Sequence, residues 1–277
     1  MKKLIFLLCL PVLIFMGCMK QKPTESTVLQ YFTPLGNYPY SFNGKIQKMT
    51  EKNYWGKVDN GKYLKGNKIT QKELDSMKWM PDYEVNLNRD GLIENCSAID
   101  ENGKTIWKNQ LKIENSKYVV NQFYRNDTLR YYENIKYNEK GELSEVSRYR
   151  PVVDTLIVTG VVLRNPTGDT ITMKGLNAKG ELMFSNIQFL NKEKKHTGAE
   201  AYGPNGEFNG STECLYNDKG VIQKFSYFDK DKNLTNWEEY IYLEYDEKDN
   251  VILACYKDAE GRMAITERTY TYYEPEQ

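Results

Sequence analysis

Few residues in this chain have the types and spacing needed for acid–base or nucleophilic chemistry. The single histidine, His196, follows the charged run 191–195. A Ser-His-Asp site requires a histidine held beside a serine and a carboxylate, whereas this composition predicts a solvated loop. Motifs of the GxSxG, P-loop, GxGxxG and HExxH types do not occur in the sequence.

Two carboxylate pairs, Glu238–Glu239 and Asp229–Asp231, are candidates for glycoside hydrolysis, which uses two acidic side chains around one bond. Both pairs lie in or beside turn sequences, where acidic residues are expected for conformational reasons. The run 229–233 also spaces oxygen atoms as some calcium loops do, but it lacks the glycine and the distal glutamate of an EF-hand. We predict solvated turns here, with no catalytic residue, metal or cofactor.

Three cysteines remain once Cys9, in the leader, and Cys18, at its end, are set aside. They are Cys96, Cys214 and Cys255. An odd number permits at most one disulfide in an oxidising compartment. Cys214 and Cys255 both fall on predicted strands beside turns, so they are the candidate pair; the alternative is three buried, small apolar side chains.

The element that must position these residues is a turn flanked by alternating side chains. Its clearest copy is the sequence Tyr-Asn-Asp-Lys-Gly-Val-Ile over 216–222, and further copies begin at Phe228, Tyr245 and Tyr256. Glycine, or asparagine in its place, tolerates the positive φ of a tight turn, and the preceding Asn or Asp bonds to nearby backbone. With period-two flanks, each copy predicts a hairpin of two antiparallel strands.

Turn signals of this kind continue from residue 83 to residue 273. A single hairpin cannot bury its apolar face alone, so we predict an all-β fold, an antiparallel β-meander of stacked hairpins in an open, solenoid-like sheet. The 22 tyrosines suit a half-wet face from which hydroxyl groups reach water. The predicted apolar parity includes Trp107, Leu111 and Ile113; Leu129, Tyr131, Ile135 and Tyr137; and Trp237, Ile241, Leu243 and Tyr245.

One short segment departs from the β pattern. Thr70 and Glu73 form a capping-box sequence, Leu74 and Met77 share one face, and Pro81 ends the segment. This pattern predicts the one helix of the chain, near 70–80.

The stretch 151–165 is nearly continuously apolar, which predicts a strand buried on both faces or a junction in the sheet. We therefore expect an N-terminal β region over 34–150 and a C-terminal repeat region over 151–277, which also fit one continuous domain. Lys plus Arg and Asp plus Glu each number 38, so the formal net charge is zero. Such a balance provides no basic surface and excludes nucleic acid as a partner.

The chain opens with a leader over 1–17, in which two lysines precede an apolar run that is short for a membrane span. It ends in Gly17 and Cys18, which resemble the lipobox of bacterial lipoproteins, although Phe15 stands where leucine is usual. The resemblance implies lipidation of Cys18, with a tether over 18–33. Several acyl chains would anchor the protein stably; the alternative is an ordinary signal peptide.

The residues after Cys18 bear on sorting. Met19 is not the aspartate that retains lipoproteins in the inner membrane of enteric-type bacteria. The sequence Lys-Gln-Lys over 20–22 differs from the acidic export signal of Bacteroidetes. We expect a cell-envelope lipoprotein on the periplasmic face of the outer membrane, with the cell surface as the alternative.

The segments 137–143, 216–222 and 245–251 resemble the YD repeats of Rhs-type proteins. The resemblance covers about residues 85–273 and implies β-hairpin repeats, with no activity attached. Rhs shells are far longer and enclose a toxin domain. The chain also resembles the small repeat lipoproteins of Bacteroidetes.

Several Asp-Ser/Thr-aliphatic triplets resemble the O-glycosylation motif of exported Bacteroidetes proteins. This resemblance implies glycan on Thr128, Thr155 or Thr170, and a further triplet contains Ser76. The alternative is that Asp-Thr simply forms a junction between a turn and a strand.

Together these features predict a lipid-anchored β-repeat protein of the cell envelope. We expect a non-enzymatic binding or scaffold module for an envelope protein or glycan, because aromatic-rich faces suit both partners. One alternative is an envelope enzyme acting on carbohydrate or peptidoglycan. Another is a spacer or assembly factor held at the membrane.

Overall fold

The computed structural model describes residues 42–70, 72–73 and 81–274. The predicted leader over 1–17, the lipidation site Cys18 and the tether over 18–33 lie outside these residues. Within the described part of the chain, no helix is long and apolar enough to cross a membrane.

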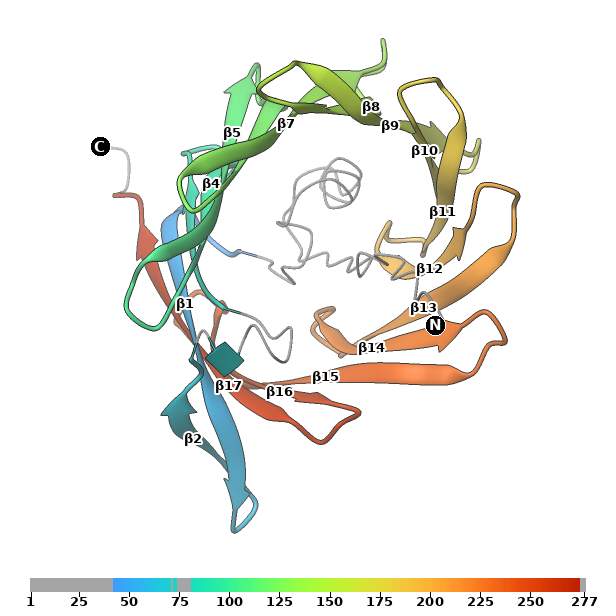
Figure 1. Ribbon diagram of the computed structural model, residues 1–277. Coiled ribbons are helices and arrows are strands. Elements are labelled where there is room, and N and C mark those ends of the chain that lie inside the picture. Colours follow the sequence, from blue (N-terminus) through green and yellow to red (C-terminus); the bar gives the residue numbers. More distant parts are fainter. Residues whose placement is uncertain (1–41, 71, 74–80, 275–277) are drawn as a thin grey trace, which may run out of the picture.

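Seventeen β-strands account for most of the described chain, and their pairings are antiparallel (Figure 1). This confirms the predicted all-β meander of hairpins. The strands are β1 (Ile46–Asp59), β2 (Lys62–Lys68), β3 (Asp82–Leu87), β4 (Ile93–Ile99), β5 (Thr105–Glu114), β6 (Lys117–Arg125), β7 (Thr128–Tyr137), β8 (Leu143–Arg150), β9 (Thr155–Arg164), β10 (Thr170–Leu176), β11 (Leu182–Leu190), β12 (His196–Tyr202), β13 (Phe208–Tyr216), β14 (Ile222–Asp229), β15 (Leu234–Tyr245), β16 (Val251–Asp258) and β17 (Met263–Tyr272).

Turns of one design join many of these strands. After β13, Asn217 Oδ1 accepts the N–H groups of Lys219 and Val221, each at 3.0 Å. Gly220 has a φ of 73°, a left-handed conformation that glycine adopts without steric cost. The predicted turn chemistry of this repeat is therefore confirmed.

Three turns of this design place a residue other than glycine in the left-handed position: one uses Lys194, and the other two differ from the prediction. The positive φ falls on Lys232 and Asp249, at 64° and 61°, one position before the predicted Asn233 and Asn250. Asn250 is fully buried, and its Nδ2 donates to the carbonyl of Asn43 at 2.9 Å. The asparagine thus ties this turn to the start of the described chain.

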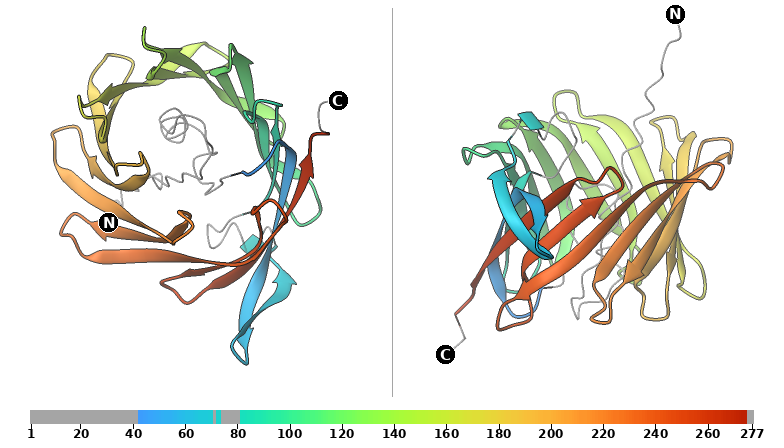
Figure 2. Two further views of the ribbon diagram at one scale, coloured as in Figure 1. Left: turned by 180° about the vertical axis from the view of Figure 1, so that it is seen from behind. Right: turned by 90° about the horizontal axis from the view of Figure 1, so that it is seen from below.

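The sheet closes on itself (Figures 1 and 2). β17 pairs with one edge of β1, from Ile46 opposite Tyr272 to Trp55 opposite Ala264, and β3 pairs with the other edge. β3 to β17 are consecutive neighbours, so together with β1 they form a barrel of 16 strands. The predicted open, solenoid-like sheet is wrong, because β1 joins the two ends of the meander and leaves no free edge along the described wall.

Among the described strands, β2 alone stands outside the ring. It pairs with the distal half of β1, between Tyr54 and Asp59. The β1–β2 hairpin therefore projects from the barrel wall (Figures 1 and 2).

Side chains alternate between the inside and the outside of a barrel. In β3, the buried residues Tyr83, Val85 and Leu87 alternate with less buried ones. Apart from the β1–β2 hairpin, the described chain adds no layer outside this wall, so the buried parity faces inward. Buried apolar side chains form three main clusters on the inner wall, which contain Met49, Val146 and Phe225 respectively.

Tyrosine hydroxyl groups tie neighbouring strands together near the turns. Tyr216 donates to the carbonyl of His196, and Tyr242 donates to that of Ile222, both at 2.6 Å. The sequence predicted that such hydroxyls reach water. They instead satisfy backbone carbonyls at strand ends, which fixes the strand register.

The apolar stretch 151–165 is not a strand buried on both faces. Val152 and Val153 lie in the turn before β9 and are 94% and 66% exposed. Within β9, Val162 is buried whereas Leu163 is 46% exposed. β9 pairs with β8 and β10 in the regular antiparallel pattern, so its apolar residues occupy both inner and outer positions of an ordinary barrel strand.

The predicted capping box is present at Thr70. Its N–H and hydroxyl groups both donate to Glu73 Oε2, at 2.8 and 2.7 Å, and the Glu73 N–H donates back to Thr70 Oγ1 at 3.4 Å. Glu73 Oε1 also accepts the indole N–H of Trp55 at 3.0 Å, which ties this turn to β1. Leu74 and Met77, the predicted apolar face of the helix, lie outside the described residues.

Candidate functional site

The inner wall of β6 to β8 carries a hydrogen-bonded row of polar side chains. Asn121, Glu133 and Arg148 are successive cross-strand partners. Arg148 Nε and Nη2 donate to Glu133 Oε1 at 2.9 and 2.8 Å, and Asn121 Nδ2 donates to Glu133 Oε2 at 2.7 Å. The Glu133 side chain is fully buried, whereas that of Arg148 is 20% exposed. The guanidinium group is thus the accessible part of the row.

The carboxyl group of Glu133 titrates close to neutral pH. Burial raises the pKa of Glu133 to about 7, against the opposing effects of the Arg148 guanidinium and the Asn121 amide. Burial and the ion pair with Arg148 thus act on this pKa in opposite directions.

Asn109, on the neighbouring strand β5, has unused hydrogen-bonding capacity. Its side chain is fully buried, and neither Oδ1 nor Nδ2 has a partner among the described residues. The same is true of Oδ1 of Asn121. Buried amides are nearly always paired in folded proteins, and an unpaired one costs about 1–3 kcal/mol. Unpaired amide atoms on two neighbouring strands are therefore candidate recognition groups.

Aromatic rings adjoin these amides on the inner wall. The ring centroids of Trp107 and Phe123 lie 6.1 Å apart, and those of Phe123 and Tyr131 lie 4.8 Å apart. All three residues are only partly buried, and the Arg148 guanidinium lies 4.2 Å from the centroid of the Tyr131 ring. We call the following set the inner-wall site: Trp107, Asn109, Asn121, Phe123, Tyr131, Glu133 and Arg148.

A second group of unpaired polar atoms lies on the inner wall of β11 to β13. Both side-chain polar atoms of Gln188, Nε2 of His196 and Oγ1 of Thr212 are buried without a partner among the described residues. Gln188 and Thr212 are both cross-strand partners of Ala199. The small alanine side chain leaves these polar groups without a neighbour to bond.

His196 does not lie in a solvated loop, as the sequence predicted. It is the first residue of β12, it is fully buried, and its Nδ1 lies 3.3 Å from Cys214 Sγ. Burial lowers the pKa of His196 to about 3 and raises the pKa of the Cys214 thiol. A nucleophilic cysteine requires the thiolate, so this neutral pair lacks the activation that cysteine chemistry needs. The charged run 191–195 forms the turn before β12, and the buried strand begins at His196.

Glu238 and Glu239 point to opposite faces of β15. Glu238 accepts the hydroxyl groups of Tyr227 and Tyr240 on the inner wall, at 3.1 and 3.0 Å, and burial raises its pKa. Glu239 is opposite Lys224 on the other face. Because glycoside hydrolysis needs two carboxyl groups around one bond, this pair is not arranged for it.

The acidic turn between β14 and β15 uses its oxygen atoms internally. Asp229 Oδ1 accepts the backbone N–H groups of Asp231 and Asn233, each at 2.9 Å. The described residues contain no cluster of three or more His, Cys, Asp or Glu side chains that could hold a metal ion. Turn geometry thus accounts for the calcium-like spacing over 229–233.

The predicted disulfide between Cys214 and Cys255 is wrong. Both cysteines are buried free thiols, and Cys96 is buried as well. Two strands separate β13 from β16, which places the two Cα atoms about 14 Å apart at ~4.8 Å per strand, whereas a disulfide requires less than about 7 Å. The two cysteines also point to opposite faces of the sheet. Cross-strand pairing links Cys214 to Phe225, Glu238 and Asp258 in turn, so these four side chains share the inner face. Cys255 lies an odd number of residues before Asp258 on the same strand, so its side chain points outward.

The three predicted O-glycosylation sites lie at turn-to-strand junctions. Thr128 and Thr155 are exposed, and Thr170 is partly buried. The preceding Asp127 and Asp154 have positive φ values of 57° and 49°, so both aspartates are turn residues. Modification of these threonines remains a prediction.

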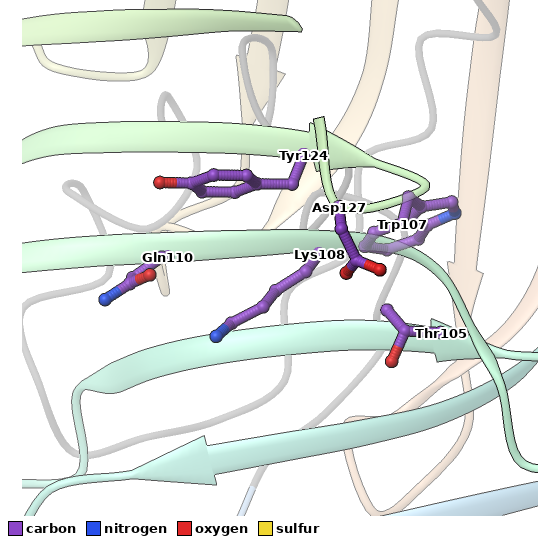
Figure 3. A pocket seen from close by; sticks show the side chains of 6 residues that line it. All are labelled: Thr105, Trp107, Lys108, Gln110, Tyr124 and Asp127. Atoms are coloured by element: carbon purple, nitrogen blue, oxygen red, sulfur yellow. The ribbon is translucent and has the colours of Figure 1, made fainter. Parts of the chain in front are cut away.

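The outer wall carries a shallow pocket at one end of β5 and β6 (Figure 3). Its volume is about 180 Å³, which is below the roughly 300 Å³ at which typical ligand sites begin. Lys108 and Tyr124 are cross-strand partners there, on the face opposite to Asn109. The lining residues are Thr105, Trp107, Lys108, Gln110, Tyr124 and Asp127.

Sequence reasoning missed the inner-wall site, although a signal for it was present. The predicted apolar parity of β5 includes Trp107 and Leu111 but skips Asn109 between them. In β7 it includes Tyr131 and Ile135 but skips Glu133. A polar residue at an inward position of an otherwise apolar strand face is the signal that could have found the site.

Scans against protein-family models and against curated proteins find no match. Among solved structures, the chain is similar to a porin-like protein from Bacteroides uniformis, with 5% identity and a TM-score of 0.37, over 83% of this chain and 98% of that one. It is similar to a LolA superfamily protein from Nitrosomonas europaea, with 9% identity and a TM-score of 0.29, over 85% and 89% of the two chains. A third is a putative outer membrane lipoprotein-sorting protein domain from Vibrio parahaemolyticus, with 8% identity, a TM-score of 0.22 and coverage of 84% and 87%.

Proposed function

We propose that the chain is a non-enzymatic binding module of the bacterial cell envelope that binds a glycan at the inner-wall site. The observation that carries this proposal is the set of buried, unpaired amide atoms of Asn109 and Asn121 beside the rings of Trp107 and Phe123. Lipid on Cys18 would hold the barrel at the membrane, on the periplasmic face of the outer membrane.

The chemistry of these groups matches a hydroxyl-rich ring. Aromatic faces pack against the apolar C–H faces of a sugar, as they do against other flat apolar surfaces. The amide of Asn109 offers two donors and an acceptor, and Asn121 Oδ1 offers a further acceptor. The partly exposed guanidinium of Arg148 adds a charged donor on the neighbouring strand β8. Ligand sites typically combine an apolar surface with a few placed polar groups, and this set of residues offers both.

The carboxyl groups of the inner wall support binding rather than hydrolysis. Glu133 is bonded to Arg148 and Asn121. Asp258 accepts two backbone N–H groups of its own turn and the Nε–H of Arg262. Carboxyl groups held in this way are committed to structure and are poorly placed to transfer protons to a substrate.

The outer wall supports attachment through lipid rather than insertion of the wall itself. It carries ion pairs between Lys48 and Glu84 and between Lys136 and Glu145, each at 2.8 Å. A lysine facing hydrocarbon costs about 2–4 kcal/mol near the bilayer centre, so these strands are suited to water.

The test is a glycan array probed with the purified full chain and two variants. Asn109→Leu removes the amide from the inner wall, and Gln110→Leu makes the same change one residue along, on the outer wall. We expect a discrete glycan class to bind the unaltered protein and the Gln110→Leu variant. Asn109→Leu should bind about tenfold more weakly, which corresponds to the loss of one or two hydrogen bonds.

Equal affinity of the two variants would place the ligand elsewhere on the protein. Absence of any bound glycan, with both variants folded, would overturn the glycan class. Release of a shortened glycan would instead support the envelope enzyme alternative.

A further inference from the structure

The projecting β1–β2 hairpin carries a free strand edge. Closure of the barrel pairs both edges of every wall strand, whereas the ladder found for β2 among the described residues is the one with β1. Among the described residues, no backbone group of another strand bonds to its second edge. Exposed edges of this kind pair readily with an added strand.

The backbone groups available along this edge follow from the turn. Asn60 and Gly61 both have positive φ, 50° and 76°, which defines a two-residue type I′ turn. Asp59 and Lys62, which flank the turn, form a hydrogen-bonded pair. In the alternation of an antiparallel ladder the next pair, Val58 and Tyr63, is a non-hydrogen-bonded pair. The N–H and C=O groups of Tyr63 and Lys65 therefore point away from β1, toward the free edge.

Contacts with the barrel hold the hairpin in place. Tyr63 accepts a hydrogen bond from Lys257 Nζ at 3.2 Å, and Lys65 Nζ lies 2.6 Å from Glu267 Oε1. Both contacts reach side chains of the neighbouring strands β16 and β17. A strand held in this way is already extended, so less conformational entropy is lost when another segment pairs with it.

The charge of the hairpin is positive. Its residues 56–68 contain four lysines and one aspartate, a formal charge of +3. Lys57 and Lys62 are exposed, and neither forms an ion pair with a described residue, whereas Lys65 and Lys68 do. Lys62 lies on β2 itself and therefore favours carboxylates on an incoming strand, and Lys57, opposite Leu64 on β1, adds positive charge on the same face.

We propose that β2 is a docking edge for an extended, acidic segment of a partner protein, which adds as a strand beside Tyr63 and Lys65. Main-chain hydrogen bonds would supply the pairing, and Lys62, with the positive charge of Lys57 behind it on β1, would select carboxylates. A second copy of this chain is disfavoured, because β2 paired with itself would bring lysines opposite lysines.

The probe is a fluorescent peptide of eight residues that alternates glutamate with valine or threonine, titrated into the purified full chain. The control is a peptide of equal charge with proline at alternate positions. Proline has no backbone N–H group, so this peptide cannot form a strand ladder. We expect the first peptide to bind, the second not to bind, and amide hydrogen exchange to slow at Tyr63 and Lys65.

Two variants test the edge and its charge. Lys65→Pro removes an outward N–H group and should abolish binding, while Lys65→Gln keeps that group and should bind within about twofold of the unaltered protein. Lys62→Glu should weaken binding about tenfold, whereas Lys108→Glu, an equal charge change elsewhere on the outer wall, should not.

Binding that survives Lys65→Pro, or protection that appears on other strands, would overturn strand addition at β2. Failure of the acidic peptide to bind would overturn it as well. The lysines would then serve to prevent pairing of this edge with other strands. If the protein forms a dimer that Lys65→Pro dissociates, the occupant of the edge is a second copy of this chain. None of these outcomes depends on glycan binding at the inner-wall site.

Discussion

The inner walls of β5–β8 and of β14–β16 both bury carboxyl groups among aromatic rings, but they differ in how completely their polar atoms are bonded. Glu238 is bonded by the hydroxyls of Tyr227 and Tyr240. The wall of β5–β8 satisfies Glu133, but both polar atoms of Asn109 lack a partner among the residues that the structure describes. A structural role is enough to explain the bonded Glu238 network, but it does not explain the buried amide of Asn109.

This difference separates two uses of inward polar residues. A fully bonded buried network rigidifies a core, whereas a partly bonded one carries a desolvation cost with no return in stability. Because the two walls belong to one barrel, the comparison can be tested by matched substitutions within one protein.

The largest effect is expected for Arg148→Ala. This change leaves the fully buried carboxyl of Glu133 without its cationic partner, and breaking such a pair typically costs about 3–5 kcal/mol. Urea unfolding at a pH well above 7, where Glu133 paired with Arg148 is ionised, measures the loss. The matched change, Lys136→Ala, breaks an exposed ion pair with Glu145 on the outer wall and should leave the unfolding free energy unchanged within error.

Equal stability of the two variants would mean that the Glu133 carboxyl is hydrated or protonated without cost, which would weaken the contrast between the walls. The double variant Glu133→Leu with Arg148→Met supplies a second check. It should recover most of the stability, because an apolar pair of similar volume replaces the stranded charge.

An intermediate effect is expected for Tyr240→Phe on the second wall. The change removes the hydroxyl that donates to Glu238 at 3.0 Å, and the loss of a hydrogen-bond partner of a buried polar group costs about 1–3 kcal/mol. Thermal and urea unfolding should both report the loss. Tyr124→Phe is the control, since its hydroxyl bonds to Gln122 on the outer wall; a similar loss in both variants would show that the Glu238 network is not specially stabilising.

Sequence reasoning succeeds where a few adjacent residues decide the geometry. The turn at Asn217 and the capping box of Thr70 and Glu73 were predicted because each depends on local hydrogen bonds. Strand pairing follows from such turns, since a tight turn places its flanking strands side by side. These elements account for most of the meander.

Closure of the barrel could not be predicted in the same way. It depends on β1 meeting β17, with Ile46 opposite Tyr272, and no local pattern encodes a pairing across more than two hundred residues. The outcome follows from strand number, tilt and accumulated twist, which act over the whole sheet. The error about Cys214 and Cys255 has the same origin, because turns fix neighbours but say nothing of strands further apart.

The side chains that point into the barrel were predicted correctly for β5 and wrongly for β15. In β5 the apolar parity of Trp107 and Leu111 points inward. In β15 the predicted parity of Trp237 and Ile241 is the outer one, because Tyr240 and its neighbours of even number face inward. Where aromatic and aliphatic residues occupy both faces of a strand, alternation no longer distinguishes inside from outside.

The smallest effect, and the one that bears most directly on function, is expected for Asn109→Leu. Leucine has nearly the shape of asparagine but needs no hydrogen bond, so it should raise the unfolding free energy by about 1 kcal/mol if the amide is unpaired in the absence of ligand. Asn121→Leu is the matched control, because Asn121 Nδ2 donates to Glu133 Oε2 at 2.7 Å and its loss should destabilise the protein. A gain in stability joined to a loss of glycan affinity would mean that Asn109 is kept for recognition at a cost to folding. If Asn109→Leu destabilises as Asn121→Leu does, an ordered water already satisfies the amide, and the two walls differ in hydration rather than in purpose.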